Sequence, residues 1–306
     1  MGGGSWTPHD WDKYSVTSGI SSSTATAKTI YKAKKLKDTY DPLRITLRES
    51  RDSTDNPNST AICVALDVTG SMNNILTAVA KRLGDLVKEI YDKKPVSDPQ
   101  VMFMAVGDCA CHDEAPLQVT QYESDIRIAE QLTDLWFEGG GGGNDSESYT
   151  LPWYFLSHRT SIDCFEKRQK KGFLFTMGDD GPPRKISPEE IARVFGDKIP
   201  QALTTEELLD QVSRQYEVFH LILAQGSNHS DTHKERWDKL LGERAIVVTD
   251  YEKLPEIICS LLRAIAGESK DKIIGSYDGS TALVVATAIK DLKIDTVSSG
   301  GVVKFD

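Results

Sequence analysis

The polar side chains at positions 67–71 could bind a metal ion. Asp67 supplies a carboxylate, and Thr69 and Ser71 supply hydroxyl groups, so the set contains only oxygen donors. Oxygen donors are the ligands that a hard divalent cation such as Mg²⁺ prefers. The turn follows residues 61–66, whose unbroken apolar run predicts a strand buried on both faces. Because ligands gather at the carboxyl ends of strands in open α/β sheets, this turn is a candidate cation site. The alternative is that Thr69 and Ser71 only cap the next helix.

A glycine-rich loop later in the chain offers a second set of oxygen donors. Five glycines at 139–143 are followed by Asn144, Asp145 and Ser146. Such a loop lets the backbone approach a ligand closely and can hold a phosphate. The Lys-Ser/Thr ending of a nucleotide-binding P-loop is absent, and the amide, acid and hydroxyl groups favour a cation. Asn144 or Ser146 could equally cap the following helix, with Glu147 in its first turn, and the two interpretations are compatible.

A third candidate loop follows residues 172–177, another continuous apolar run that predicts a buried strand. Asp179 and Asp180 stand in this loop, ahead of a glycine and two prolines. Asp-Asp-Gly-Pro is by itself an ordinary turn sequence. Its occurrence together with the two other loops makes it a candidate for cation binding.

Elements of suitable length separate these loops. Residues 73–91 carry apolar side chains three and four positions apart, which predicts an amphipathic helix. Residues 101–106 predict a second parallel strand, so that strand, helix and strand form a βαβ unit. Further strands are predicted at 116–121, 218–224 and 244–248, and further helices at 124–135, 149–158, 230–241, 252–266 and 281–292. We interpret His220, in the middle of a predicted strand, as a core residue.

The loop at 107–114 contains two cysteines, a histidine and three acids. Thiol and imidazole groups could bind zinc, but Cys-x-Cys-His is too tight for the usual structural zinc spacing and no second ligand pair is obvious. We therefore interpret it as an acidic loop beside the Asp67 turn, because neighbouring parallel strands end at the same edge of a sheet. Asp108 is the residue of this loop that we expect to lie near a metal ion.

The three oxygen-rich loops resemble the metal-ion-dependent adhesion site of the von Willebrand factor A (vWA) family. The family's first motif, Asp-x-Ser/Thr-x-Ser, is present in full, and Asp179 with its Gly/Pro turn resembles the third motif. The second loop resembles a Gly-Gly-Asp-x-Pro-Glu variant in which Asn144 stands at the Asp position and Ser146 at the Pro position. The resemblance covers roughly residues 60–267 and is closest to intracellular bacterial or phage members.

This resemblance implies an α/β fold with a doubly wound, mostly parallel central sheet and helices on both faces, as in Rossmann-like proteins. It also implies one Mg²⁺ or Mn²⁺ at the top of the sheet. The metal ligands that it implies are Asp67, Thr69, Ser71, Asn144 and Asp179, some of them through water, with Asp145 or Ser146 as alternatives to Asn144. The accessory residues expected near the metal are Asp108, Asp145, Ser146 and Asp180.

The resemblance also implies a function. In this family the metal keeps an open position that a carboxylate of a protein partner fills. We therefore expect a protein-interaction module rather than an enzyme, acting inside a multiprotein complex, with a ring-forming ATPase among the candidate partners. A structural subunit with a vestigial metal site is the first alternative. A metal-dependent phosphoester hydrolase that uses Asp108, Asp113 and Asp180 is the second.

Composition narrows the class of partner and the compartment. The chain of 306 residues has a formal net charge of −10, which argues against a general nucleic-acid or anionic-membrane binder. No apolar run approaches the roughly 18 residues of a membrane-spanning helix, and the first residues lack the features of a signal peptide. The five cysteines are odd in number and partly placed in apolar runs, which favours reduced thiols and a cytoplasmic location.

We expect three segments along the chain: an N-terminal arm at 1–60, the vWA-like domain at 61–267 and a C-terminal extension at 268–306. Trp6 and Trp11 suggest that the arm packs on the body of the protein.

Four stretches outside the candidate site also carry expectations. The turn-rich stretch 48–60 is expected to be a loop. The basic runs at 31–38 and 167–171 are expected to be solvated surfaces. A short strand is expected within 297–305.

Overall fold

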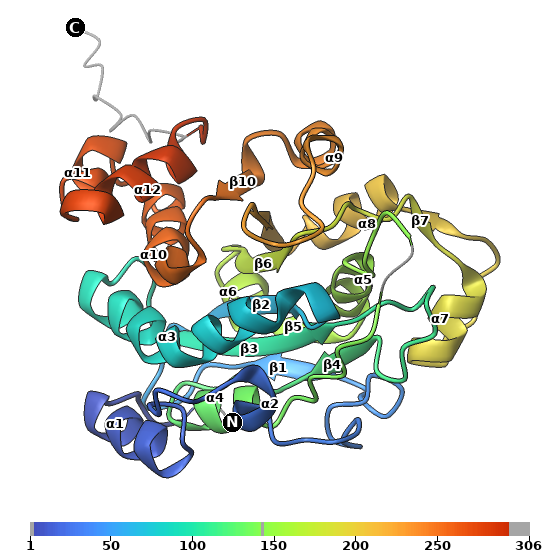
Figure 1. Ribbon diagram of the computed structural model, residues 1–306, viewed down its shortest axis with the longest axis horizontal. Coiled ribbons are helices and arrows are strands. Elements are labelled where there is room, and N and C mark those ends of the chain that lie inside the picture. Colours follow the sequence, from blue (N-terminus) through green and yellow to red (C-terminus); the bar gives the residue numbers. More distant parts are fainter. Residues whose placement is uncertain (1–2, 142–143, 294–306) are drawn as a thin grey trace, which may run out of the picture.

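The computed structural model describes residues 3–141 and 144–293, which form a layered α/β structure (Figure 1). The strands are β1 (Arg48–Ser50), β2 (Thr60–Asp67), β3 (Pro99–Val106), β4 (Leu117–Val119), β5 (Thr160–Ile162), β6 (Gly172–Gly178), β7 (Lys185–Ile186), β8 (Leu203–Thr204), β9 (Tyr216–Leu223) and β10 (Ala245–Val248). The α-helices are α1 (Pro8–Thr17), α2 (Ala27–Ile30), α3 (Asn73–Lys93), α4 (Arg127–Thr133), α5 (Thr150–His158), α6 (Asp163–Glu166), α7 (Pro188–Phe195), α8 (Thr205–Val212), α9 (Asp231–Leu241), α10 (Leu254–Ile265), α11 (Lys270–Ile274) and α12 (Gly279–Ile289). Three 3₁₀ turns complete the set: η1 (Gly70–Met72), η2 (Gly242–Arg244) and η3 (Tyr251–Lys253).

The central sheet has six strands in the order β10-β9-β6-β2-β3-β4. All neighbours pair in parallel except β3 and β4, which are antiparallel. From β2 the chain crosses first to β3 on one side and later to β6 on the other. This reversal is the topological switch point at which open α/β sheets bind ligands. The predicted α/β class and doubly wound, mostly parallel sheet are therefore confirmed.

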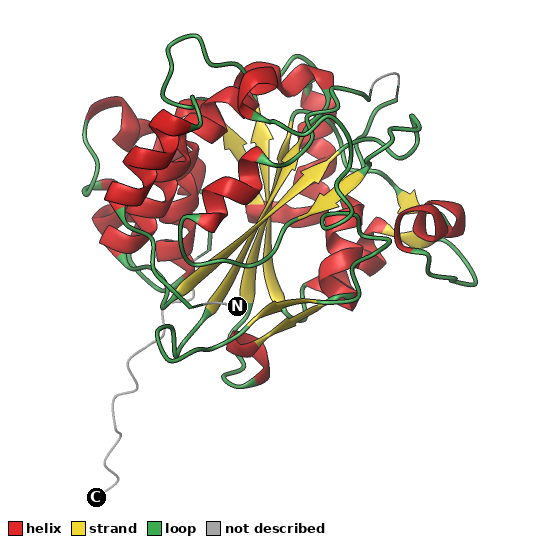
Figure 2. Ribbon diagram, turned by 90° about the horizontal axis from the view of Figure 1, so that it is seen from below, coloured by secondary structure: helices red, strands yellow, loops and turns green. Residues whose placement is uncertain are grey.

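Both faces of the sheet are covered by helices, as the edge-on view in Figure 2 shows. Alternate residues of β2 serve two separate cores, because side chains point to opposite faces along a strand. Val64 and Leu66 belong to the core shared with α3 and α10, whereas Cys63 and Ala65 belong to the core shared with α5, α8 and α9. Seven of the eight residues of β2 are buried, so its unbroken apolar run reflects cover on both sides.

The N-terminal segment is packed into the first of these cores. Trp6 is buried and stacks on Trp11, with ring centroids 5.7 Å apart. Trp11 lies directly on α3 at Gly84, where an added Cβ would come within 2.1 Å of the indole Nε1. Ile20, which lies in a polar low-complexity stretch, is also buried. The arm thus shares a core with the sheet, although few of its residues are apolar.

Two small sheets lie outside the central one. Residues 48–60 were expected to form a loop, but Arg48–Ser50 forms β1 and pairs in parallel with β5, with Arg48 opposite Thr160. This expectation was wrong at residues 48–50, because the pairing partner lies far away in sequence, and at Thr60, which begins β2. β7 and β8 form the second small sheet and pair antiparallel.

The C-terminal extension contributes α11 and α12, and Val285 and Ile289 of α12 are fully buried against α10 and β10. The strand expected within 297–305 lies outside the described residues. None of the described helices is both long and apolar enough to cross a membrane.

Candidate metal centre

The first candidate loop begins where β2 ends. Asp67 is its last strand residue and is fully buried. Asp67 Oδ1 accepts hydrogen bonds from the Thr69 backbone N–H at 2.9 Å and from Thr69 Oγ1 at 2.6 Å. The chain then turns through η1 into α3, and Thr69 Oγ1 lies 3.4 Å from Ser71 Oγ. The three oxygen-bearing side chains predicted from the sequence therefore lie in one connected turn.

The third loop meets the first directly. Asp179 follows β6, the strand next to β2, and Ser71 Oγ donates a hydrogen bond of 3.0 Å to Asp179 Oδ1. The Asn228 backbone N–H donates to the other oxygen, Oδ2, at 2.9 Å. Gly226 makes this approach possible, because a Cβ there would stand 2.1 Å from Asp179 Cβ. Asp179 is thus fixed beside the Asp67 turn.

The second loop lies against the first through its glycines. The Gly70 N–H donates to the Gly140 carbonyl at 3.1 Å. Gly141 has a φ of +80°, and a Cβ there would come within 2.7 Å of Thr69 Cγ2 and 3.0 Å of Glu147 Oε1. Only glycine fits this position comfortably, on both conformational and steric grounds. The long glycine run therefore brings backbone against the Asp67 turn.

The polar residues after the glycines differ in their surroundings. Asn144 Oδ1 is buried and accepts no hydrogen bond from the described residues. Asp145 is exposed, and its backbone carbonyl accepts a 3.0 Å hydrogen bond from Arg236 Nη1. Ser146 is half-buried. Of the three alternatives for the second ligand, Asn144 is thus the one with a buried and unpartnered oxygen.

The two acidic neighbours expected from the sequence have partners of their own. Asp108 Oδ1 accepts from the Ala110 N–H at 2.8 Å, whereas Asp108 Oδ2 is buried and unpartnered among the described residues. Asp180 Oδ1 accepts from the Gly181 N–H at 2.8 Å and lies 3.5 Å from His233 Nε2. Asp180 belongs to the third loop, and the Asp108 loop is joined to the second loop through Asp113.

Three further residues of the centre were not among the predicted metal ligands or accessory residues, although Asp113 was named for the hydrolase alternative. Glu147 is 2% exposed, and its Oε2 has no hydrogen-bond partner in the described part of the chain. Asp113 accepts from the Asp108 N–H at 2.7 Å and the Gly141 N–H at 3.0 Å, so it ties two loops together. Tyr149 donates its hydroxyl to Asp67 Oδ2 at 2.7 Å. Glu147 could have been found, because it occupies the final Glu position of the second motif.

Several buried carboxyl groups lie close together in this centre. Burial raises the pKa of Asp67 to about 7, although hydrogen bonds from Thr69 and Tyr149 oppose the rise. Burial also raises the pKa of Glu147 to about 10, and the negative charges of Asp67 and Asp108 add to this effect. Both shifts reflect the cost of unbalanced negative charge away from water. A cation would supply the missing positive charge.

The donor set fits a hard divalent ion. Among residues 3–141 and 144–293, no three His, Cys, Asp or Glu side chains stand close enough to hold a metal by themselves. The loops instead combine two carboxylates with two hydroxyls, and a buried amide oxygen and two buried carboxyl oxygens nearby lack partners. Mg²⁺ and Mn²⁺ accept such mixed oxygen ligands and retain water. Within the same residues, the loop that contains Cys109 and Cys111 forms no zinc cluster.

A buried aromatic group supports the centre from behind. Gly178 leaves room for Tyr149, whose hydroxyl would lie 1.9 Å from a Cβ at that position. Tyr149 packs edge-on against Trp237, and His220 stacks on Trp237 with centroids 3.6 Å apart. Burial keeps the pKa of His220 well below its usual value. The interpretation of His220 as a core residue is therefore confirmed.

Helix α9 holds the loops together from one side. Arg236 donates to the carbonyl of Asp145 in the second loop and to that of Pro182 in the third. Trp237 Nε1 donates to the Asp180 carbonyl at 2.9 Å. Two consecutive side chains of one helix thus bind the backbone of both loops.

No protein-family model and no curated protein sequence matches the chain. Among solved structures it is similar to the pilus adhesin SpaC from Lactobacillus rhamnosus GG, with 11% identity and a TM-score of 0.46 over 71% of this chain and 32% of the adhesin. It is also similar to the vWA domain of SpRpn10, with 12% identity and a TM-score of 0.34 over 60% of this chain and 82% of that domain. The chain thus spans about a third of the length of the adhesin.

Proposed function

We propose that this chain is a divalent-cation-dependent protein-interaction module with a vWA-like metal-ion-dependent adhesion site. Mg²⁺ or Mn²⁺ would be held by Asp67, Thr69, Ser71, Asn144 and Asp179. The bound ion would supply positive charge at the carboxyl edge of the sheet, and an Asp or Glu carboxylate of a partner protein would bind to it. Asp108, Glu147 and Asp180 would add negative charge around the ion.

The hydrogen bond between Ser71 Oγ and Asp179 Oδ1 carries this proposal. It joins two loops that are remote in sequence at the switch point of the sheet, where ligands of this fold class bind. The unpartnered buried oxygens of Asn144 and Glu147 support it further, because a buried polar atom without a partner costs free energy unless a ligand satisfies it.

Hydrogen bonds within the chain hold two of the proposed metal ligands in place. Tyr149 and the Thr69 N–H hold the Asp67 carboxylate in place through its two oxygens. The Asn228 N–H holds Asp179. Preorganised ligands lower the cost of ordering when a cation and then a carboxylate arrive.

The partner and compartment are part of the same proposal. We infer a protein partner within a multiprotein complex, a ring-forming ATPase being one candidate, rather than nucleic acid or a membrane, because the net charge is −10. The five cysteines form no disulfide in the described residues, and four of them are buried, which supports a reducing cytoplasm.

The experiment compares partner capture with and without a free divalent cation. The immobilised chain is exposed to lysate of its source organism in Mg²⁺, and bound proteins are eluted with chelator and identified. We expect a partner that elutes with chelator and is absent from the Asp67→Ala variant. A set of bound proteins that ignores both chelator and the substitution would contradict the proposal and favour a purely structural subunit.

A further inference from the structure

A cavity lies far from the candidate metal centre. It has a volume of about 420 Å³ and is lined by Thr60 at the start of β2, Phe173 in β6 and Glu217 in β9. These residues mark the amino ends of the strands, whereas Asp67 marks the carboxyl end of β2. The eight residues of β2 separate the two sites by roughly 23 Å, at about 3.3 Å per residue. The volume falls in the range of small-molecule pockets.

One wall of this cavity is apolar. Phe173 is 6% exposed, and Val96 and Ile265 are half-buried beside it. Ile265 is the last residue of α10, and Val96 lies in the loop between α3 and β3. These side chains belong to or pack on the core around α3, so this wall rests on well-packed structure.

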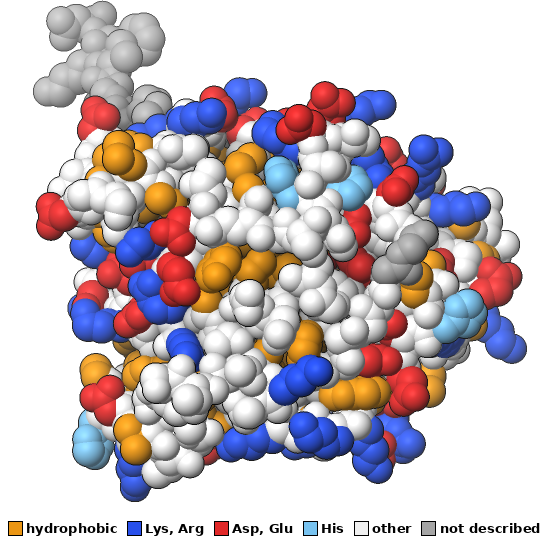
Figure 3. Space-filling view, viewed as in Figure 1, with side chains coloured by type: hydrophobic (Ala, Val, Ile, Leu, Met, Phe, Trp, Pro, Cys, Tyr) orange, Lys and Arg blue, Asp and Glu red, His pale blue; other side chains and the backbone are white. Residues whose placement is uncertain are grey.

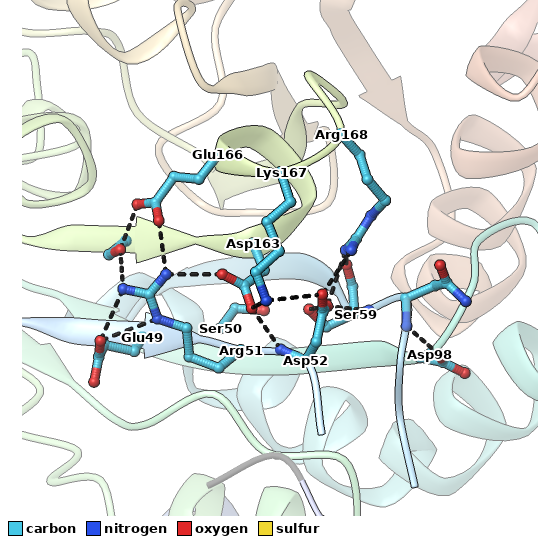
Figure 4. A network of polar contacts seen from close by, with 12 residues as sticks. Glu49, Ser50, Arg51, Asp52, Ser59, Asp98, Asp163, Glu166, Lys167 and Arg168 are labelled. Atoms are coloured by element: carbon cyan, nitrogen blue, oxygen red, sulfur yellow. Dashed lines mark hydrogen bonds and ion pairs between the residues drawn. The ribbon is translucent and has the colours of Figure 1, made fainter. Parts of the chain in front are cut away.

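Another part of the lining comes from the basic run 167–171, which follows α6. Gln169 has a left-handed backbone with φ of +55°, and the Lys170 N–H donates to the Cys164 carbonyl at 2.9 Å. This turn divides the run. Lys167 and Arg168 point toward Asp52, as Figure 4 shows. Lys170 and Lys171 follow the turn and line the cavity together with Arg168, whose guanidinium group is bound to Asp52.

The first two basic groups of the run are neutralised. Arg168 donates to both carboxylate oxygens of Asp52, at 2.8 and 3.1 Å, and Lys167 contacts Asp52 at 3.2 Å and Asp163 at 2.7 Å (Figure 4). Although burial opposes it, the hydrogen bonds from Arg168, Ser59 and Lys167 hold the pKa of Asp52 below its usual range. The charges of Lys167 and Arg168 are therefore balanced by acidic side chains of the protein itself.

The other two basic groups are less fully paired with acids. Lys171 Nζ lies 3.6 Å from Glu217, but Arg244 contacts the same carboxylate. Lys170 is exposed and forms no ion pair with the residues that the structure describes. Asp98, which follows the lining residue Ser97, accepts the backbone N–H of Asn58 at 2.7 Å. An excess of positive charge thus faces a cavity with an apolar wall, in a chain of strongly negative net charge.

We propose that this cavity binds a small organic anion, in which a carboxylate or phosphate group is attached to an apolar body. Lys170 and Lys171 bind the charged group, because charge-assisted hydrogen bonds are the stronger kind. Val96, Phe173 and Ile265 cover the apolar body. This site is independent of the metal centre and of its proposed function.

The test uses the full chain in chelator, so that the metal centre does not contribute. Titration calorimetry measures the binding of phenyl phosphate, benzoate, inorganic phosphate and phenol. We expect phenyl phosphate or benzoate to bind at least about tenfold more tightly than both inorganic phosphate and phenol, because only the first two combine charge with an apolar body. The tighter of the two identifies the charged group.

The double variant Lys170→Glu/Lys171→Glu should weaken this binding by roughly tenfold or more. The matched control is Lys34→Glu/Lys35→Glu, in which two exposed lysines of the other basic run carry the same change in charge. Figure 3 shows Lys and Arg side chains gathered along the lower edge of the view, where Figure 1 places this N-terminal segment. Equal losses in both variants, equal affinity for inorganic phosphate and phenyl phosphate, or no binding of any probe would overturn the proposal.

Discussion

Ser71 Oγ donates a 3.0 Å hydrogen bond to Asp179 Oδ1 across 108 positions of sequence. The contact is possible because β2 and β6 are parallel neighbours in register, with Leu66 opposite Met177, so that both strands end at the same height. Gly226 lets Asp179 approach, and the Asn228 N–H holds it there. This hydrogen bond shows that two of the three candidate loops meet at one site.

Replacing Tyr149 by Phe should destabilise the protein while leaving its ring packing intact. The hydroxyl donates to the buried Asp67 carboxyl, and a hydrogen bond to such a group contributes about 1–3 kcal/mol. Urea denaturation measures the change in the free energy of unfolding. Tyr154→Phe is the control, because its hydroxyl binds the partly exposed Asp197 and its loss should cost less. An equal effect in the two variants would contradict this account of Tyr149.

Removing the Arg236 side chain should weaken cation binding without unfolding the protein. Arg236 joins the backbones of the second and third loops, which carry Asn144 and Asp179. In Arg236→Ala we expect the affinity for Mg²⁺ to fall by roughly tenfold, because the ligands must then be ordered during binding. Titration calorimetry gives the affinity, and Lys239→Ala, an exposed change on the same helix, should leave it unchanged.

The variant Glu147→Gln should be as stable as the natural chain or more stable without cation, yet gain less from Mg²⁺. The substitution removes a buried acid whose pKa is raised to about 10 by burial and nearby carboxylates. Thermal unfolding with and without Mg²⁺ measures both effects, since a ligand stabilises the state that binds it. Glu114→Gln, an exposed change in the acidic loop, is the control. If Mg²⁺ stabilises Glu147→Gln as much as it stabilises the natural chain, Glu147 is not part of the metal centre.

The ion pair between Arg263 and Glu268 should make the attachment of the C-terminal segment depend on pH. Hydrogen bonds from Arg263 lower the pKa of Glu268 to about 2, from an ordinary value of 4.5. A carboxyl with a lowered pKa in the folded state stabilises the fold above its unfolded pKa, and this contribution is lost as pH falls from 4.5 toward 2. We therefore expect Glu268→Gln to be less stable than the natural chain at neutral pH, with the difference shrinking below about pH 4.5. Urea denaturation at several pH values measures this, and a constant difference would contradict it.

Much of the sheet was predictable because buried parallel strands appear as continuous apolar runs. The runs at 61–66, 101–106 and 172–177 correspond to β2, β3 and β6, and the polar residues that follow them lie at one edge. The direct contact between Ser71 and Asp179 also follows from that logic, once the strands are neighbours.

What the sequence did not reveal depends on contacts between remote segments. Tyr149 directly precedes the aromatic helix α5, and only the structure shows that its hydroxyl passes Gly178 and reaches Asp67. Asp113 was considered only as an acid for a hydrolase, yet it links two loops through backbone N–H groups. The N-terminal helices were missed because isolated residues such as Ile20 form the core without any periodic pattern.

The central claim is that the loops after β2 and β6 hold one divalent ion together. Titration calorimetry of Mg²⁺ and Mn²⁺ into chelator-treated protein tests it most directly, with Asp67→Ala and Asp179→Ala measured in parallel. We expect one site per chain in the natural protein and loss of that site in each variant, although Asp67 ends β2 and Asp179 follows β6. Binding that persists in both variants, or a natural chain that binds neither ion, would contradict the claim.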